Sequence, residues 1–283
     1  MFSPKEIAQN YITLGEAKAG YSVLKMLVLG VMAGMFVALA GVGATISQTT
    51  VAGTSIAYTG KLLGALVFTT GLAMVLIAGS ELFTGNCLII VSVLAKSVKP
   101  GAMLKNWFFV YLGNFIGGFI VVLITVYGGT YSSFGNLAAV TAITTAVSKV
   151  SLSFGDALLR GILCNFLVCV AVWMAFAAKD VAGKIAALFL PIMLFVLCGY
   201  EHCIANAYFI PTGLLAARDT VYLGAYYAAS GASSVASLTW GAMFVRNIIP
   251  STLGNIIGGA GMVGAVYWFA YIRLDSSPKT GGL

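Results

Sequence analysis

The sequence carries six apolar stretches, each long enough to cross the roughly 30 Å hydrocarbon core of a bilayer as a helix. Only 8% of the 283 residues are charged, which is too few to cover a water-soluble surface. We therefore predict an all-α, multi-pass membrane protein and exclude a soluble enzyme, a disordered chain and a disulfide scaffold. The predicted spans cover residues 23–47, 61–97, 107–129, 156–178, 185–217 and 247–272.

The second and fifth spans are too long for a simple crossing. They contain 37 and 33 residues, whereas about 20 suffice. Each is also interrupted by polar residues, GSELFTGN at 79–86 and GYEHCIAN at 199–206. A continuous helix would bury these polar groups at mid-depth at a cost in free energy. We therefore predict that each of the two spans consists of two half-helices joined by an irregular turn.

These interruptions belong to an internal repeat. Both have the pattern G-x-E-x-x-x-x-N, and in the spans that follow, LGNFIGG at 112–118 matches LGNIIGG at 253–259. With three spans in each half, the halves are inverted relative to each other, which places a substrate path where the repeats meet. The single predicted channel domain, 1–283, comprises an N-terminal helix, a first repeat, an outer loop, a second repeat and a cytoplasmic tail, at 1–22, 23–130, 131–155, 156–272 and 273–283.

The N-terminus and the basic residues indicate how the chain lies in the membrane. Ser3 and Glu6 have capping-box spacing, and we expect an amphipathic helix over 4–18 at the membrane surface. Lys and Arg number ten on the side of both termini and five on the other. Because cytoplasmic loops carry the excess, we predict cytoplasmic termini and an inner (plasma) membrane location. The net charge of +7 is assigned to these loops and not to nucleic-acid binding.

The two breaks bring polar side chains to mid-depth. Half-helices that begin there present positive dipole ends and unpaired N–H groups, which attract an anion. Thr84 and His202 lie at the breaks and are able to donate hydrogen bonds to it. The glutamates Glu81 and Glu201 are either proton-relay acids or, the reading we favour, ties for the broken backbone.

Three further polar residues are candidates for support of the breaks. Asn165 and Asn255 either steady the broken backbone or touch the permeant species. Lys149 is either a solvated charge or a cation that draws anions into an outer vestibule. The side chains that flank the breaks are apolar. If a pore runs there, they form dry constrictions that reject hydrated ions; they are Leu72, Leu82, Phe195, Phe68 and Phe83.

The motifs as a whole resemble the formate–nitrite transporter family over nearly all six spans. The resemblance rests on ELFTGN at 81–86, KNW at 105–107 with YLGN at 111–114, GYEHCIAN at 199–206, and NIIP at 247–250 with GNIIG at 254–258. It implies an aquaporin-like fold, a homopentamer with one pore in each protomer, and passage of small monovalent anions such as formate, nitrite, hydrosulfide or lactate.

The resemblance also implies roles for individual residues. Thr84 and His202 are then the central pair, and Lys149, Asn165, Glu201 and Asn255 occupy supporting positions. Leu72, Leu82 and Phe195 correspond to an inner constriction, and Phe68 and Phe83 to an outer one. In some members of the family this threonine is followed by Ser-Thr, whereas Thr84 is followed by Gly-Asn-Cys. In this feature the sequence is similar to the hydrosulfide branch of the family.

Two other classes of function remain as alternatives. An aquaporin-like channel for water or small neutral solutes is disfavoured because the sequence has no Asn-Pro-Ala. A membrane-embedded enzyme using His202 and Glu201 is disfavoured because no nucleotide motif appears. We expect no catalytic residues, no cofactor and no metal, since a single histidine and five scattered cysteines are poor material for a zinc site.

Overall fold

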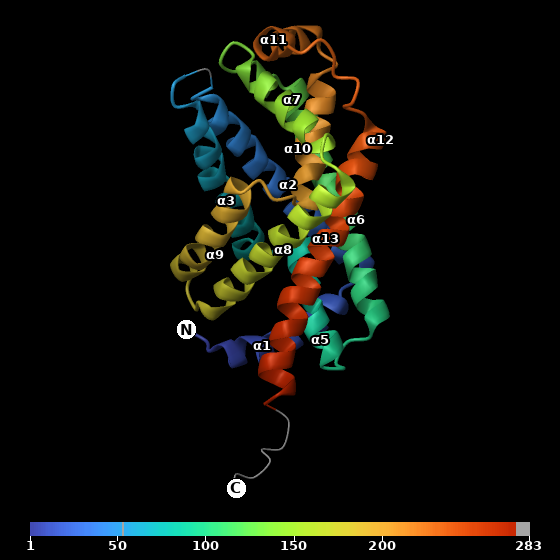
Figure 1. Cartoon of the computed structure of the whole chain (residues 1–283). Coiled ribbons are helices and arrows are strands. Elements are labelled where there is room, and N and C mark those ends of the chain that lie inside the picture. Colours follow the sequence, from blue (N-terminus) through green and yellow to red (C-terminus); the bar gives the residue numbers. More distant parts are fainter. Residues whose placement is uncertain (53, 276–283) are drawn as a thin grey trace.

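The computed structural model describes residues 1–52 and 54–275, and every regular element in this part of the chain is helical. The helices form an elongated bundle with both described ends of the chain at one pole (Figure 1). Within these described residues, five helices are long and apolar enough to span a membrane. They are α2 (Val23–Thr49), α3 (Gly60–Ile77), α6 (Pro100–Tyr127), α8 (Phe154–Ala177) and the continuous helix Trp240–Arg273, which comprises α12 (Trp240–Ala242), α13 (Ile249–Ile256) and α14 (Val266–Trp268) with wider π turns between them.

Two apolar segments are interrupted. Helix α3 ends at Ile77, and the chain becomes helical again over Phe83–Leu94, through α4 (Phe83–Asn86) and α5 (Ile90–Leu94). In the same way, α9 (Val181–Leu197) is separated from α10 (Cys203–Ala216). A left-handed glycine ends the first helix of each pair, Gly79 at φ +80° and Gly199 at φ +69°. Only glycine adopts this conformation without strain, so it stops the helix at that point.

A short helix, α1, precedes the long ones and packs alongside them. Helix α1 (Pro4–Ala19) starts with the capping box expected from the sequence, in which the Ser3 hydroxyl accepts from Glu6 N–H and the Glu6 carboxylate accepts from Ser3 N–H. The backbone and hydroxyl hydrogen bonds from Ser3 lower the pKa of the Glu6 carboxyl. Helix α1 buries Tyr11 and Gly15 against α5, where Ser92 donates to the Tyr11 carbonyl.

The segment 131–155, predicted as an outer loop, is largely helical. Helix α7 (Leu137–Val150) packs on α10. Its buried residues recur every three or four positions, which is the spacing of one helix face; they are Ala138, Ala139, Ala142, Ile143, Ala146 and Val150. Helix α11 (Thr220–Ser230) packs on α7 and covers the pole opposite the two termini (Figure 1). Of the predicted tail 273–283, residues 276–283 lie outside the described part.

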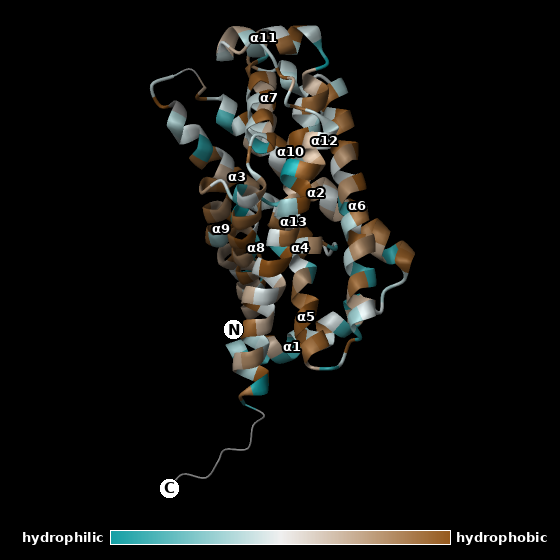
Figure 2. Ribbon diagram, turned by 45° about the vertical axis from the view of Figure 1, so that its right-hand side comes forward, coloured by the Kyte–Doolittle hydropathy of each residue, from teal (hydrophilic) through white to brown (hydrophobic). Residues whose placement is uncertain are grey.

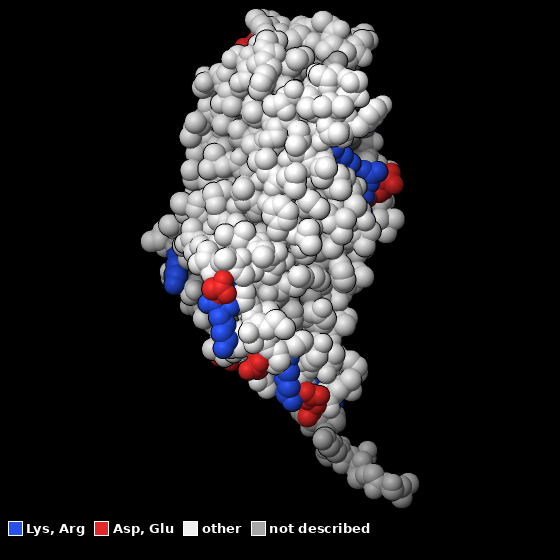
Figure 3. Space-filling model, turned by 90° about the vertical axis from the view of Figure 1, so that its left-hand side faces the viewer, with Lys and Arg blue, Asp and Glu red and all other residues white. Residues whose placement is uncertain are grey.

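The sides of the bundle are apolar, as expected for a multi-pass membrane protein. Large hydrophobic side chains such as Phe108, Ile124 and Leu190 are more than half exposed, and hydrophobic residues recur along the long helices of the bundle (Figure 2). On the face shown in Figure 3, charged side chains gather mainly toward the pole of the two termini. A water-exposed surface would not leave so much apolar area uncovered.

Glycines bring two pairs of long helices into backbone contact. Helices α2 and α6 meet where Gly34 lies against Asn114 and Gly117 against Val31. Helices α8 and α13 meet where Gly254 lies against the carbonyl of Leu158. A Cβ at any of these glycines would collide with the neighbouring backbone, so close helix approach fixes the frame that holds the two breaks.

Candidate functional site

At the first break, a buried carboxylate organises a cluster of polar side chains. Glu81 accepts a hydrogen bond from Lys18 at 2.7 Å and another from the Asn86 amide at 2.7 Å. Lys18 also donates to the Asn86 side-chain oxygen at 2.9 Å. Asn86 in turn donates to Asn106 at 2.8 Å, and Trp107 donates to the Asn86 carbonyl. Helix α1 therefore contributes its lysine to the start of the second half-helix.

The second break has a matching cluster. Lys149, in the last turn of α7, donates to both oxygens of Glu201 at 3.1 Å. The Asn206 amide donates to Glu201 at 2.6 Å and to Asn247 at 2.7 Å, and Asn247 donates to Glu201 at 2.9 Å. Both glutamates are therefore neutralised by a lysine and held by an asparagine, which supports a structural role for them.

Two asparagines tie the breaks to the neighbouring helices in the same way. Asn114 of α6 accepts from the Phe83 N–H at 2.9 Å and donates to the carbonyls of Gly30 and Glu81. Asn255 of α13 accepts from the Cys203 N–H at 3.0 Å and donates to the carbonyls of Gly161 and Glu201. Backbone groups that a helix leaves unpaired at a break are thus satisfied by side chains.

Thr84 and His202 meet between the two breaks. The Thr84 hydroxyl lies 3.1 Å from His202 Nε2, and both residues are buried. His202 is also the N-cap of α10, because its Nδ1 accepts the Ala205 N–H at 3.0 Å. A nitrogen that accepts this bond carries no proton, so in the neutral ring the proton lies on Nε2 and points to Thr84. The Thr84 hydroxyl then accepts from His202, and its own proton is free for another acceptor.

Asn165 of α8 holds the backbone of Thr84 in place. Its amide donates to the Thr84 carbonyl at 3.2 Å and to the Asn255 carbonyl at 2.8 Å. The Cys169 thiol, one turn later, donates to the same Thr84 carbonyl at 3.3 Å. The predicted supporting residues Asn165 and Asn255 are therefore in contact with each other, although they come from α8 and α13, and Asn165 also contacts Thr84.

An apolar ring surrounds a very small cavity beside His202. The cavity measures about 10 Å³, and roughly 10–15 Å³ is needed for one water molecule. Phe68 meets Phe195 edge to face at a centroid separation of 5.8 Å, and Phe195 stacks on the His202 ring at 5.9 Å. The remaining lining residues are Val37, Leu72, Leu82, Val168 and Ile192. Four of the residues predicted to form constrictions thus line this one small cavity.

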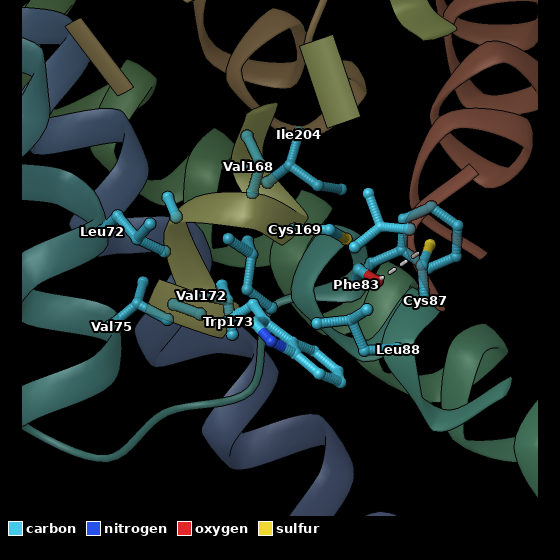
Figure 4. Packing of buried hydrophobic residues seen from close by; sticks show 14 of the residues in the cluster. Leu72, Val75, Phe83, Cys87, Leu88, Val168, Cys169, Val172, Trp173 and Ile204 are labelled. Carbon is cyan, nitrogen blue, oxygen red and sulfur yellow. Dashed lines mark hydrogen bonds between the residues drawn. The ribbon is translucent and has the colours of Figure 1, made fainter. Parts of the chain in front are cut away.

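Phe83 lies elsewhere. Its ring packs edge-on against Tyr111 at 4.8 Å and Trp107 at 5.9 Å, and it lines a shallow apolar groove between α6 and α13. In Figure 4, Leu72 and Val75 lie on one side and Phe83 lies with Cys87 on the other. The peptide after Leu82 turns into the half-helix, so successive side chains point in different directions. Phe68 therefore lines the small cavity, whereas Phe83, predicted to form an outer constriction with it, lines the separate groove.

A larger pocket of about 630 Å³, called the vestibule below, lies beside this small cavity. Phe68, Phe195 and His202 form part of its floor, and Lys149 and Glu201 also line it. Phe68 and Phe195 therefore separate the vestibule from the small cavity, with His202 reaching both. Among the described residues, no group of three or more His, Cys, Asp or Glu has the geometry to hold a metal ion.

The sequence reasoning missed several members of the two polar clusters, namely Lys18, Asn86, Asn106, Asn206 and Asn247. A signal was present for two of them, because Asn86 and Asn206 close the repeated G-x-E-x-x-x-x-N pattern. Lys18 is separated from Glu81 by 63 residues, and no local pattern relates them. Their pairing depends on how α1 packs.

Comparisons with known proteins match this architecture over most of the chain. The formate/nitrite transporter family matches residues 5–269. The Formate channel FocA of Haemophilus influenzae is 40% identical over 235 residues, covering 83% of this chain and 82% of the relative. FocA of Escherichia coli is 35% identical over 271 residues, covering 95% and 94%. The chain is a multi-pass membrane protein, and it belongs to the formate/nitrite transporter family.

Solved structures agree with this assignment. One described as a pentameric formate channel with formate bound superposes with a TM-score of 0.78 at 35% identity, covering 88% of this chain and 97% of the other. A second, described as an FNT family ion channel, gives a TM-score of 0.77 at 25% identity, covering 94% and 98%.

Proposed function

We propose that this protein is a channel that passes formate and other small monovalent anions of weak acids across the membrane, through a pore in each protomer. The observation that carries the proposal is the buried contact between Thr84 and His202, at 3.1 Å, where the two half-helices begin. Relatives named as formate channels support formate as the first candidate. Nitrite and hydrosulfide remain further candidates within the same chemistry.

The cost that such a site must offset is dehydration. An isolated anion in an apolar passage loses several kcal/mol or more of hydration free energy. The N-terminal ends of the segments beginning at Phe83 and Cys203 supply positive dipole ends near the central pair. The Thr84 hydroxyl supplies a proton donor, because it accepts from His202 and its own hydrogen is free. The permeant thus meets oriented dipoles and not a fixed cation.

The cap made by His202 bears on how protons take part. An imidazolium would require a proton on Nδ1, which would break the hydrogen bond from Ala205 N–H at 3.0 Å. We propose that His202 stays neutral while the anion passes. Its Nε2–H donates to the Thr84 hydroxyl, and the Thr84 hydroxyl donates to the anion. A proton that crosses with the anion then enters from the vestibule as part of the weak acid. Transport is expected to rise at mildly acidic pH, where more of the acid is protonated.

We also propose that the fold consists of two inverted repeats, aquaporin-like in outline, with six spans of which the second and fifth are broken. The matched clusters of Glu81 and Glu201, and the matched ties of Asn114 and Asn255, support this arrangement. Each repeat then begins with its short helix, α1 or α7, each of which delivers a lysine. We further propose that both termini lie on the cytoplasmic side of the inner membrane, which the ten-to-five excess of basic residues supports.

Flux through the purified protein in proteoliposomes tests the proposed function. We expect uptake of formate, nitrite and hydrosulfide, each rising as external pH falls from 7 to 6, and no swelling in glycerol. Glycerol permeation without anion flux would instead establish the aquaporin-like alternative. Chemical conversion of the anion during uptake would point to the membrane-enzyme alternative.

Widening the apolar ring should relax selectivity. In Leu82→Ala or Phe195→Ala we expect the flux of a larger anion such as lactate to rise by roughly tenfold relative to formate, since a dry ring rejects by size and dehydration. Phe83→Ala is the matched control, because this ring lines the separate groove. Equal formate-to-lactate ratios in all three variants and the wild type would make the ring ordinary packing.

We propose that the protein assembles as a homopentamer. The pentameric solved structure with 35% identity supports this assembly, and so does the exposed apolar groove of Phe108, Ile249 and Leu253. The mass of the protein part in detergent is expected to be five times the 29.4 kDa of one chain. A stable particle with the mass of a single chain would contradict the proposal.

A further inference from the structure

Two cations in the vestibule have no ion-pair partner among the described residues. Lys61 comes from the first turn of α3 and Arg160 from α8, and both line the vestibule. The third vestibule cation, Lys149, contacts both oxygens of Glu201 at 3.1 Å, so this pair is nearly neutral. The uncompensated positive charge of the chamber therefore belongs to Lys61 and Arg160.

Both residues are placed beside the second break. A Cβ added to Gly199 would lie 3.3 Å from Lys61 Nζ, so the ammonium rests on the glycine turn. The Arg160 carbonyl accepts the Glu201 N–H, which holds that turn of α8 next to the break. Asp156 lies one helical turn before Arg160, but its carboxylate accepts from Ser153 at the start of α8 and forms no ion pair with Arg160.

The floor of the vestibule is less suited to hold an anion than the region around Lys61 and Arg160. The Asn206 side-chain oxygen is buried and has no hydrogen-bond donor among the described residues, and Glu201 lies beside it. Both present acceptor atoms, which repel a negative charge. An anion that enters the vestibule from solution is therefore attracted by Lys61 and Arg160 and not by the acceptor atoms of its floor.

We propose that Lys61 and Arg160 form a docking site for a small planar carboxylate or similar oxyanion, which loads the pore from the vestibule side. The guanidinium is able to bind two oxygens of such an anion at once, and the ammonium adds a compact charge. A charged cleft with low-dielectric walls concentrates anions near its mouth. This inference rests on the proposed function and specifies the residues that set apparent affinity from one side.

The test compares zero-trans formate flux in right-side-out and everted membrane vesicles at low ionic strength. In Lys61→Gln and in Arg160→Gln we expect the apparent KM from the vestibule side to rise roughly tenfold, at the low end of electrostatic focusing, with unchanged maximal flux. Flux from the opposite side should keep its KM. Added salt should raise the wild-type KM more than that of the double variant.

Two controls separate this site from a general surface effect. Arg218→Gln removes an exposed cation that does not line the vestibule, and we expect its KM to equal that of the wild type. Arg160→Lys keeps the positive charge but loses the guanidinium, which is able to donate two parallel hydrogen bonds to a carboxylate. We expect KM to rise about threefold for formate and less for hydrosulfide, which has a single acceptor atom.

The outcomes are distinguishable. Formate flux with the wild-type KM in both Gln variants would overturn the docking site while leaving the proposed function intact. The absence of formate, nitrite and hydrosulfide flux in the wild type would overturn the proposed function itself. Equal rises in KM from both sides of the membrane would also overturn the docking site, because it faces one vestibule.

Discussion

Replacing His202 with asparagine is expected to admit larger anions such as lactate, whereas formate flux should still rise from pH 7 to pH 5 because the permeant acid carries the proton. Asparagine is a good N-cap, so its side-chain oxygen takes over the Ala205 N–H and α10 keeps its start. The imidazole itself is lost, and with it the ring between Phe195 and Thr84 and the Nε2–H that donates to the Thr84 hydroxyl. The smaller side chain leaves space in the passage beside the ring, so size no longer excludes lactate.

Thr84→Val is the matched comparison for His202→Asn. Valine keeps the shape of threonine but removes the hydroxyl that accepts from His202. A hydrogen bond to a charged group contributes about 1.5–3 kcal/mol, so we expect formate flux to fall by at least tenfold. The pH profile should keep its wild-type shape, because protonation of the permeant acid sets it. If His202→Asn shows wild-type flux and selectivity, His202 serves only as the cap of α10.

The second large effect concerns the asparagine that ties the second break. We expect Asn255→Leu to abolish flux and to lower the free energy of unfolding by several kcal/mol. The Asn255 side chain accepts a hydrogen bond from the Cys203 N–H and donates to the carbonyls of Gly161 and Glu201. A leucine side chain would leave all three backbone groups buried without these partners. Each orphaned buried group costs about 1–3 kcal/mol. Asn114→Leu should act alike at the first break.

Thermal unfolding in detergent, followed by size-exclusion chromatography, measures this effect. Asn10→Leu is the control, since Asn10 is exposed on α1 and no large change is expected there. A melting temperature for Asn255→Leu equal to that of the control would show that the break holds its shape without the tie. Either Asn255→Leu or Asn114→Leu retaining wild-type formate flux would have the same meaning.

Much of the helical framework follows from local sequence patterns. Apolar length predicts where helices run, because backbone groups in lipid must be paired within the helix. The interruptions are also local, since Gly79 and Gly199 take left-handed conformations and polar residues follow them. The helices before the two breaks end at Ile77 and Leu197, within the second and fifth apolar stretches.

Only the tertiary structure shows which lysines pair with the two glutamates and in which directions the side chains of Leu82 and Phe83 point. Lys18 reaches Glu81 only because α1 packs against α5 and brings its last turn to the first break. Phe83 and Leu82 are neighbours in sequence, yet Phe83 turns to Tyr111 while Leu82 lines the small cavity. Helix phase at the start of a half-helix depends on the asparagine that accepts its first N–H, and sequence spacing does not reveal that choice.

By itself, the sequence determined that this chain crosses a membrane several times, that its second and fifth apolar stretches carry polar interruptions, and that its motifs are those of the formate/nitrite transporter family. Those properties follow from residues close together in the chain. Only the tertiary structure decided that His202 caps α10 through Nδ1 and directs Nε2 to Thr84. The physical reason is that a ring's protonation pattern depends on its hydrogen-bond partners, and Thr84 lies 118 residues away.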